Sequence, residues 1–211
     1  MAQRIAIVDY GMGNLRSVQK ALLHVAPSAQ VEISAAPEAI RTADRVVFPG
    51  QGAMPDCMKC LDESGLGDAV REAAASRPFL GLCIGLQMLF ERSDEGDTPG
   101  LGIMPGEVLA FARAPETRAA GLKIPHMGWN EAWQSRPHPL WRGIADGTRF
   151  YFVHSYYCVP GDPSLAAASS RYPHAFTSAI SRDNIFATQF HPEKSSAAGL
   201  TLLENFSTWT P

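Results

Sequence analysis

The apolar run that ends at Cys83 constrains the fold more than any other part of the sequence. Residues 79–82 are expected to form a buried strand, and a helix is expected from Ile84 to about Glu91. Cys83 stands at the junction in the pattern Gly-x-Cys-x-Gly, the thiol counterpart of the Gly-x-Ser-x-Gly nucleophile elbow. The glycines are needed because such a sharp turn brings two backbones close together. The turn places the thiol at the positive end of a helix, which favours the reactive thiolate. A small buried core residue is the alternative interpretation of this cysteine.

A second chemical motif, His191-Pro192-Glu193, stands near the end of the chain. It follows residues 184–190, which are expected to be extended, and the proline is expected to keep the chain extended beyond them. Residues two apart in an extended chain point to the same side, so the Glu193 carboxylate can reach the His191 ring. A carboxylate in that place orients a histidine that acts as general base. Although most isolated His-x-Glu pairs are surface ion pairs, this one together with Cys83 predicts a catalytic triad.

Strands and helices alternate in the first half of the sequence. Strands are expected at residues 4–9, 31–33, 45–48 and 79–82, and helices at 14–24 (capped by Asn14), from 37, at 54–61 and at 68–76. This alternation predicts an α/β fold with a mainly parallel central sheet flanked by helices.

The second half has a different pattern of short strands separated by turns, which predicts additional antiparallel strands. They are expected at residues 106–112, 122–124, 131–134, 149–157, 165–171, 175–182 and 185–190. A hairpin turn is expected at 181–184, a surface loop at 91–99, and a final amphipathic helix at 195–206. The length of 211 residues fits a single domain spanning 1–211.

Composition and charge exclude several classes of function. With 18 Lys and Arg against 21 Asp and Glu, no basic surface is expected, and nucleic acid is not an expected partner. The sequence has no apolar run long enough to span a bilayer and no N-terminal signal pattern. We therefore expect no membrane association and a cytoplasmic location.

No cofactor or metal is expected either. The cysteines at positions 57, 60, 83 and 158 fit a reduced compartment. Cys57 and Cys60 have the spacing of a metal or redox pair, but no second pair of ligands completes a metal site, so they are expected to be apolar residues on one helical face. Gly11-Met-Gly13 begins like a dinucleotide-binding motif, but Arg16 replaces its third glycine.

These residues resemble those of the class I glutamine amidotransferases, which combine a cysteine elbow with a late His-Pro-Glu. The matching segments are residues 8–15, 49–53, 125–130, 152–157 and 191–195. Within that family, the first segment and Pro-His-Met-Gly-Trp-Asn (125–130) are most similar to the glutaminase subunits of imidazole glycerol phosphate synthases.

The resemblance implies that Cys83 attacks glutamine and that the ammonia is channelled to a cyclase subunit with a TIM-barrel fold, in a heterodimer. The cyclase products would be imidazole glycerol phosphate and aminoimidazole carboxamide ribotide, in histidine biosynthesis. Another class I amidotransferase, a stand-alone γ-glutamyl hydrolase of the same fold and a non-catalytic scaffold are the alternatives.

Supporting roles can be assigned around the triad. An elbow supplies one oxyanion donor, the N–H of Ile84. The second is expected from Gln51 or Gly52, in a loop that ends the neighbouring strand, although a plain turn is the alternative there. By resemblance, Gln87 binds the amino-acid end of glutamine together with backbone groups near Ser155 and Tyr156; a core or solvated glutamine is the alternative for Gln87.

The resemblance also implies a partner interface. The candidate interface residues are Asn14, Lys123, Met127, Trp129 and Lys194. Exposed tryptophan and methionine beside glycine and proline are typical of interfaces. Trp129 could equally belong to the core.

Overall fold

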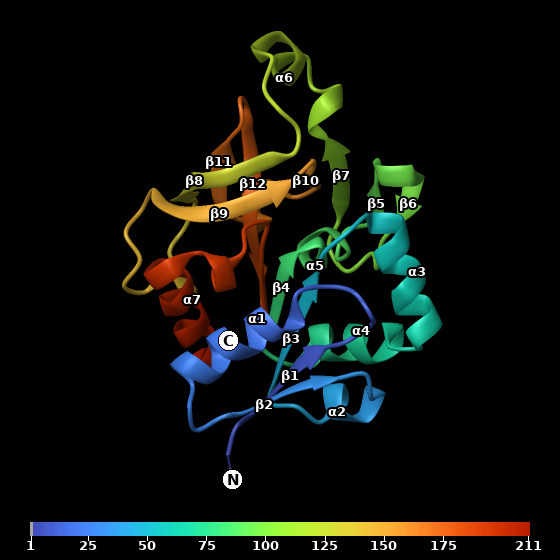
Figure 1. The fold of residues 1–211 in the computed structure, drawn as a ribbon, viewed down its shortest axis with the longest axis vertical. Coiled ribbons are helices and arrows are strands. Elements are labelled where there is room, and N and C mark those ends of the chain that lie inside the picture. Colours follow the sequence, from blue (N-terminus) through green and yellow to red (C-terminus); the bar gives the residue numbers. More distant parts are fainter. Residues whose placement is uncertain (1) are drawn as a thin grey trace.

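The computed structural model describes residues 2–211, and a parallel group of strands forms the centre of its sheet (Figure 1). These strands are β1 (Arg4–Val8), β2 (Gln30–Ser34), β3 (Arg45–Gly50), β4 (Phe79–Cys83) and β13 (Ile185–Thr188). Their order is β2-β1-β3-β4-β13, and every neighbouring pair is parallel. β4 therefore lies between β3 and β13, and the carboxyl ends of all three meet at one edge.

Helices cover both faces of this parallel group. They are α1 (Leu15–Val25), α2 (Pro37–Arg41), α3 (Met54–Ser64), α4 (Gly67–Ser76) and α7 (Ser196–Thr208). Side chains alternate along each strand, so Ile5 and Ile7 pack in a core with α1 and α7, whereas Ala6 and Val8 pack in a second core with α2, α3 and α4. Figure 1 shows α1 and α7 side by side on one face. The predicted α/β architecture is confirmed.

Antiparallel strands extend the sheet beyond β13. They are β7 (Gly106–Ala110), β8 (His126–Gln134), β9 (Thr148–His154), β10 (Tyr156–Pro160), β11 (Ala166–Arg171) and β12 (Ala175–Arg182). β12 pairs with β13, β10 and β11, and β8 lies between β11 and β9. The hairpin turn expected between β12 and β13 is present, with Asp183 at a φ of 49°.

The helix after the cysteine is much shorter than predicted: α5 covers only Ile84–Gln87. The next backbone groups bond to another segment instead of continuing the helix. Leu101 N–H donates to the carbonyl of Met88, and Ile103 and Met104 donate to that of Leu89. These long-range hydrogen bonds, which local sequence does not reveal, end the helix.

The prediction of a surface loop at residues 91–99 was wrong. The segment forms β5 (Arg92–Ser93) and β6 (Thr98–Pro99), an antiparallel pair joined by a 3-10 turn at Glu95–Asp97. β5 pairs in parallel with β7, and Ser93 is fully buried. The segment therefore extends the sheet.

Two further predictions in the second half were wrong. No strand forms at residues 122–124, and the helix α6 (Pro115–Ala120) precedes them; its signals are Pro115 at the start and Gly121, with a φ of 61°, at the end. The strand expected at 149–157 is two strands that part at Ser155. The remaining 3-10 turns are Phe111–Arg113, Pro139–Trp141, Pro163–Leu165 and Pro192–Lys194.

Candidate active site

Cys83 is the last residue of β4 and has a backbone conformation that L residues rarely adopt, with φ 54° and ψ −108°. Neighbouring glycines make this conformation possible. A Cβ atom at Gly81 would lie 2.9 Å from the Cβ of Ala187, and one at Gly85 would overlap the carbonyl oxygen of Phe48. The structure thus has the strand, sharp turn and short helix of the predicted elbow.

His191 follows β13 and is paired with Glu193. The Nδ1 atom of His191 lies 2.9 Å from Oε1 of Glu193, and the two side chains are 5% and 2% exposed. The path of the chain differs from the expected extended one, because Pro192 begins the 3-10 turn Pro192–Lys194. The turn closes when Lys194 N–H donates to the His191 carbonyl at 3.0 Å. The pair forms by way of this turn.

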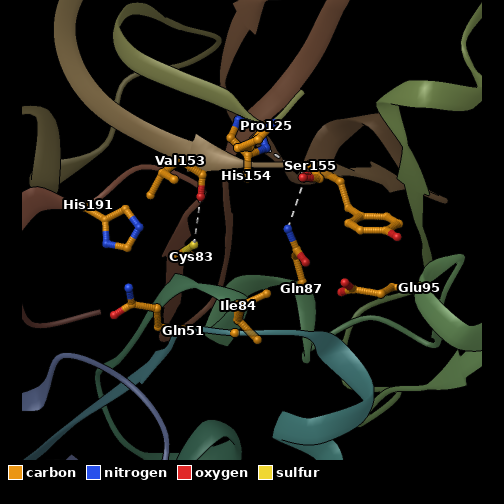
Figure 2. A pocket seen from close by; sticks show the side chains of 12 residues that line it. Gln51, Cys83, Ile84, Gln87, Glu95, Pro125, Val153, His154, Ser155 and His191 are labelled. Carbon is orange, nitrogen blue, oxygen red and sulfur yellow. Dashed lines mark hydrogen bonds between the residues drawn. The ribbon is translucent and has the colours of Figure 1, made fainter. Parts of the chain in front are cut away.

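The other side of the His191 ring faces Cys83 across the cavity floor (Figure 2). Its Nε2 atom is buried and has no hydrogen-bond partner within residues 2–211. Burial lowers the pKa of this imidazole, but Cys83 and Glu193 together raise it by more, to about 10. The arrangement therefore favours the imidazolium form of His191 beside Cys83.

The predicted oxyanion residues line the same cavity as Cys83. Ile84 follows the cysteine directly. Gly50 is in register with Cys83 across the β3–β4 pair, so the loop that starts at Gln51 lies beside the elbow. Gly52 has a φ of 126°, a conformation that favours glycine. The Cys57 thiol, 3.8 Å from the Gln51 carbonyl oxygen, bonds to this loop from α3.

Gln87 and Ser155 lie at the end of this cavity away from His191 (Figure 2). Tyr156 also lines the cavity, whose volume is about 320 Å³. Gln87 is 1% exposed, so the solvated alternative for it is wrong. Its Nε2 atom donates to the carbonyl of Tyr156 at 3.2 Å and to Oε1 of Gln189 at 3.0 Å. Its Oε1 atom is buried without a partner within residues 2–211, which leaves one acceptor for a ligand.

Sequence reasoning missed two residues of this site. The half-buried Glu95 lines the cavity, and its Oε2 accepts from Met54 N–H at 2.8 Å. No local signal marks Glu95, because its position depends on the pairing of β5 with β7, a strand that comes later in the chain. Gln189 had a signal: it stands two residues before His191, on the same side of an extended chain.

Other histidines near the site are engaged in a buried chain of hydrogen bonds. Nδ1 of His126 lies 2.9 Å from Nε2 of His154, whose Nδ1 lies 2.7 Å from the Tyr156 carbonyl oxygen. Asn130 Nδ2 completes the chain at His126 Nε2. Burial lowers the pKa of His126 to about 4 and that of His154 to about 3. With both nitrogens of each ring engaged, neither is a good alternative base.

The candidate interface residues are exposed or half-buried. Met127 and Trp129 are 62% and 51% exposed on β8, so Trp129 is not a core residue. Lys123 and Asn14 are exposed, and Lys194 is half-buried. Asn14 directly precedes α1, but its side chain makes no capping hydrogen bond, contrary to its predicted role as a cap.

Residues 2–211 contain no cluster of three or more His, Cys, Asp or Glu side chains arranged to hold a metal ion. Cys57 is buried in the core and Cys60 packs against it, both on α3. None of the helices in the described part of the chain is both long and apolar enough to cross a membrane.

Comparison with known proteins decides the family. Residues 6–208 match the family model for class-I glutamine amidotransferases. The chain belongs to this family. It is 61% identical over 209 residues to imidazole glycerol phosphate synthase subunit HisH of Aromatoleum aromaticum, covering 98% of this chain and 99% of that one. The subunit of the same name from Nitrosospira multiformis is also 61% identical, with 98% of each chain covered.

Solved structures share the fold at low sequence identity. The glutaminase domain of CTPS from Trypanosoma brucei has a TM-score of 0.66 at 15% identity, over 100% of this chain and 96% of that one. PurLQS from Thermotoga maritima has a TM-score of 0.72 at 16% identity, over 98% of both chains. At these identities the likeness concerns the fold alone.

The geometry of the elbow predicts that the stability of the protein depends strongly on glycine at position 85. We expect Gly85→Ala to destabilise the protein by about 1–3 kcal/mol or more, because the new methyl group meets the rigid backbone of Phe48. Chemical denaturation measures the change. Gly67→Ala is the matched control, since its methyl group enters open space at the start of α4 and should change stability little. Equal stability of both variants would contradict this account of the turn.

The charges around His191 predict its titration. With its pKa raised to about 10, the ring keeps its second proton as pH rises through neutrality. Cys83→Ala should lower this pKa more than Glu193→Gln does, because Cys83 makes the larger contribution to raising it. Imidazole ¹⁵N shifts followed against pH measure both effects. An unchanged His191 titration in Cys83→Ala would show that the two residues are not electrostatically coupled.

Proposed function

We propose that this protein is the glutaminase subunit of an imidazole glycerol phosphate synthase and that Cys83, His191 and Glu193 are its catalytic triad. The observation that carries the proposal is the strained Cys83 elbow facing the buried His191–Glu193 pair. Membership of the class-I glutamine amidotransferases and 61% identity to relatives named as HisH subunits support the assignment.

The reaction follows from the roles of the three side chains. The Cys83 thiolate attacks the carboxamide carbon of glutamine, and the C–N bond breaks as the His191 imidazolium gives its proton to the leaving ammonia. A γ-glutamyl thioester remains on the sulfur. Water then attacks the thioester, with His191 as general base, and releases glutamate. Glu193 keeps Nδ1 of the ring occupied, which leaves Nε2 for proton transfer.

The far end of the cavity suits the amino-acid part of the substrate. The free Oε1 of Gln87 and the Glu95 carboxylate both accept hydrogen bonds, so they fit the α-ammonium group of glutamine. Backbone groups at Ser155 and Tyr156 complete this end. A ligand held there extends its carboxamide toward Cys83, at the opposite end of the lining.

The negative oxygen that forms during attack needs hydrogen-bond donors beside the cysteine. The N–H of Ile84 is placed by the elbow itself, and an N–H of Gln51 or Gly52 is the second donor. The register of Gly50 with Cys83 supports this assignment, because it brings the loop after β3 to the elbow.

The ammonia requires an acceptor nearby, since most of it becomes non-nucleophilic ammonium in neutral water. We propose a heterodimer with a cyclase subunit of TIM-barrel fold, in the cytoplasm, that receives the ammonia through a channel. The proposed docking surface for the cyclase is formed by five residues: Asn14, Lys123, Met127, Trp129 and Lys194. Pro125 lines the cavity, and β8 runs from His126, the next residue, to the two exposed side chains.

Two other functions remain testable alternatives. Another class-I amidotransferase would use the same triad with a different acceptor, and a stand-alone γ-glutamyl hydrolase would release ammonia without a partner. Purification of the native complex identifies the acceptor subunit. Rapid glutamine turnover by the isolated chain would favour the hydrolase.

The proposed nucleophile is tested with Cys83→Ala in the complex. We expect glutamine-dependent product formation to fall by several orders of magnitude, because the covalent route is lost. The same complex should still form product when ammonium salt at alkaline pH replaces glutamine. Retention of glutaminase activity would contradict the triad, and loss of the ammonium-dependent reaction would indicate a damaged complex instead.

The proposed interface is tested by comparing two tryptophans on β8. Trp129 and Trp133 are both 51% exposed, but Trp129 lies nearer the cavity rim along the strand. We expect Trp129→Ala to weaken binding of the cyclase at least about tenfold, as buried interface tryptophans commonly do, and Trp133→Ala to weaken it less. Calorimetric titration measures both. Unchanged affinity in Trp129→Ala would contradict this docking surface.

A further inference from the structure

Gln189 is a fully buried polar residue that the mechanism above does not use. It follows β13 and is 0% exposed, and its backbone N–H donates to the carbonyl of Ser178 on β12 at 2.9 Å. Its side chain lies between two residues of the site. Oε1 accepts from Nε2 of Gln87 at 3.0 Å, and Nε2 donates to Sγ of Cys83 at 3.8 Å.

The network itself fixes which end of the Gln189 amide faces the sulfur. The carbonyl of Tyr156 can only accept, so the atom of Gln87 that lies 3.2 Å from it must be the amide nitrogen. That nitrogen also faces Gln189, which must therefore present its oxygen. The NH₂ group of Gln189 is left to face Cys83. Nδ1 of His154, 2.7 Å from the same carbonyl oxygen, holds the first member of this series in place.

The surroundings of the sulfur differ in what they offer to a thiol and to a thiolate. The carbonyl oxygen of Val153, 4.0 Å away, can accept a hydrogen bond from a neutral thiol but repels a thiolate. The amide N–H of Gln189 favours the thiolate over the thiol, because a hydrogen-bond donor stabilises negative charge. His191 faces the sulfur from another side.

We propose that Gln189 stabilises the Cys83 thiolate and holds the sulfur in place for attack. The inference rests on the proposed function, in which Cys83 is the nucleophile. When Cys83 transfers its proton to His191, the sulfur can no longer donate to the carbonyl of Val153. The negative charge on the sulfur is then stabilised by the N–H donor of Gln189. Gln87 links the two ends of the cavity, since its NH₂ group orients Gln189 while its oxygen has no partner within residues 2–211 and is left for the proposed ligand.

The test is the pH dependence of Cys83 alkylation in the full chain and of glutamine turnover in the complex with the cyclase. Gln189→Met keeps the length of the side chain and removes its N–H donor. Gln189→Glu keeps its shape and places a carboxylate beside the sulfur. Alkylation by iodoacetamide, followed by mass spectrometry of the Cys83 peptide, separates this cysteine from the other three.

We expect Gln189→Met to alkylate about ten- to a hundredfold more slowly near neutral pH, since a hydrogen bond to a charged group is lost. The pH midpoint of the reaction should move upward, and further upward in Gln189→Glu. The value of kcat for glutamine should fall in parallel, while the ammonium-dependent reaction of the complex stays intact. If Gln189→Met does not fold, the Gln189→Glu midpoint decides the question.

Gln134→Met is the matched control. The Gln134 amide donates to the Ile144 carbonyl at 2.9 Å, away from the cavity. Its loss should change thermal stability but not the alkylation midpoint. A wild-type midpoint in Gln189→Met and Gln189→Glu, with only their stability reduced, would show that Gln189 is merely structural. Glutaminase activity retained in Cys83→Ala would instead refute the proposed function, whatever Gln189 does to the thiol.

Discussion

The left-handed backbone of Cys83 can persist because the strand that carries it is held from every side. Such a conformation costs on the order of 1–3 kcal/mol, and β4 is hydrogen-bonded to β3 and β13 and buried on both faces. Glycine at positions 81 and 85 lets Ala187 and Phe48 approach to distances that any side chain would prevent. The packing of the sheet thus offsets the conformational strain at Cys83. The other residues of the site are arranged around the thiol that this strained backbone positions.

Three parallel strands ending at one edge then bring together residues that are far apart in the chain. β3 delivers Gln51, β4 delivers Cys83, and the segment after β13 delivers Gln189 and His191. Each follows the carboxyl end of its strand, the edge at which open α/β sheets bind ligands. Because β4 is central, the segments that follow its two neighbours reach Cys83 from opposite sides, one with the predicted oxyanion donors and the other with the proposed base, His191.

Local chemistry explains what could be predicted from the sequence. The elbow needs glycines at fixed offsets, and the alternation of strands and helices needs apolar runs of characteristic length, so both were found. The position of Glu95 was not, because it depends on the pairing of β5 with β7, a strand that comes later in the chain. The turn at Pro192 was misjudged for a similar reason: Ser195 Oγ donates to the His191 carbonyl at 2.6 Å and helps to hold the turn, a contact that an isolated His-Pro-Glu motif does not specify.

The remaining unsatisfied groups indicate what the cavity is built to receive. Nε2 of His191 and Oε1 of Gln87 are both buried without partners within residues 2–211, and both residues line the cavity. Leaving such groups unpaired costs about 1–3 kcal/mol each, a cost that a ligand removes if it brings a matching group to each. The imidazolium faces the reacting end, and the amide oxygen faces the end suited to an ammonium group. The two groups therefore suit the proposed substrate, because glutamine has a cationic head and a reactive carbonyl at some distance from it.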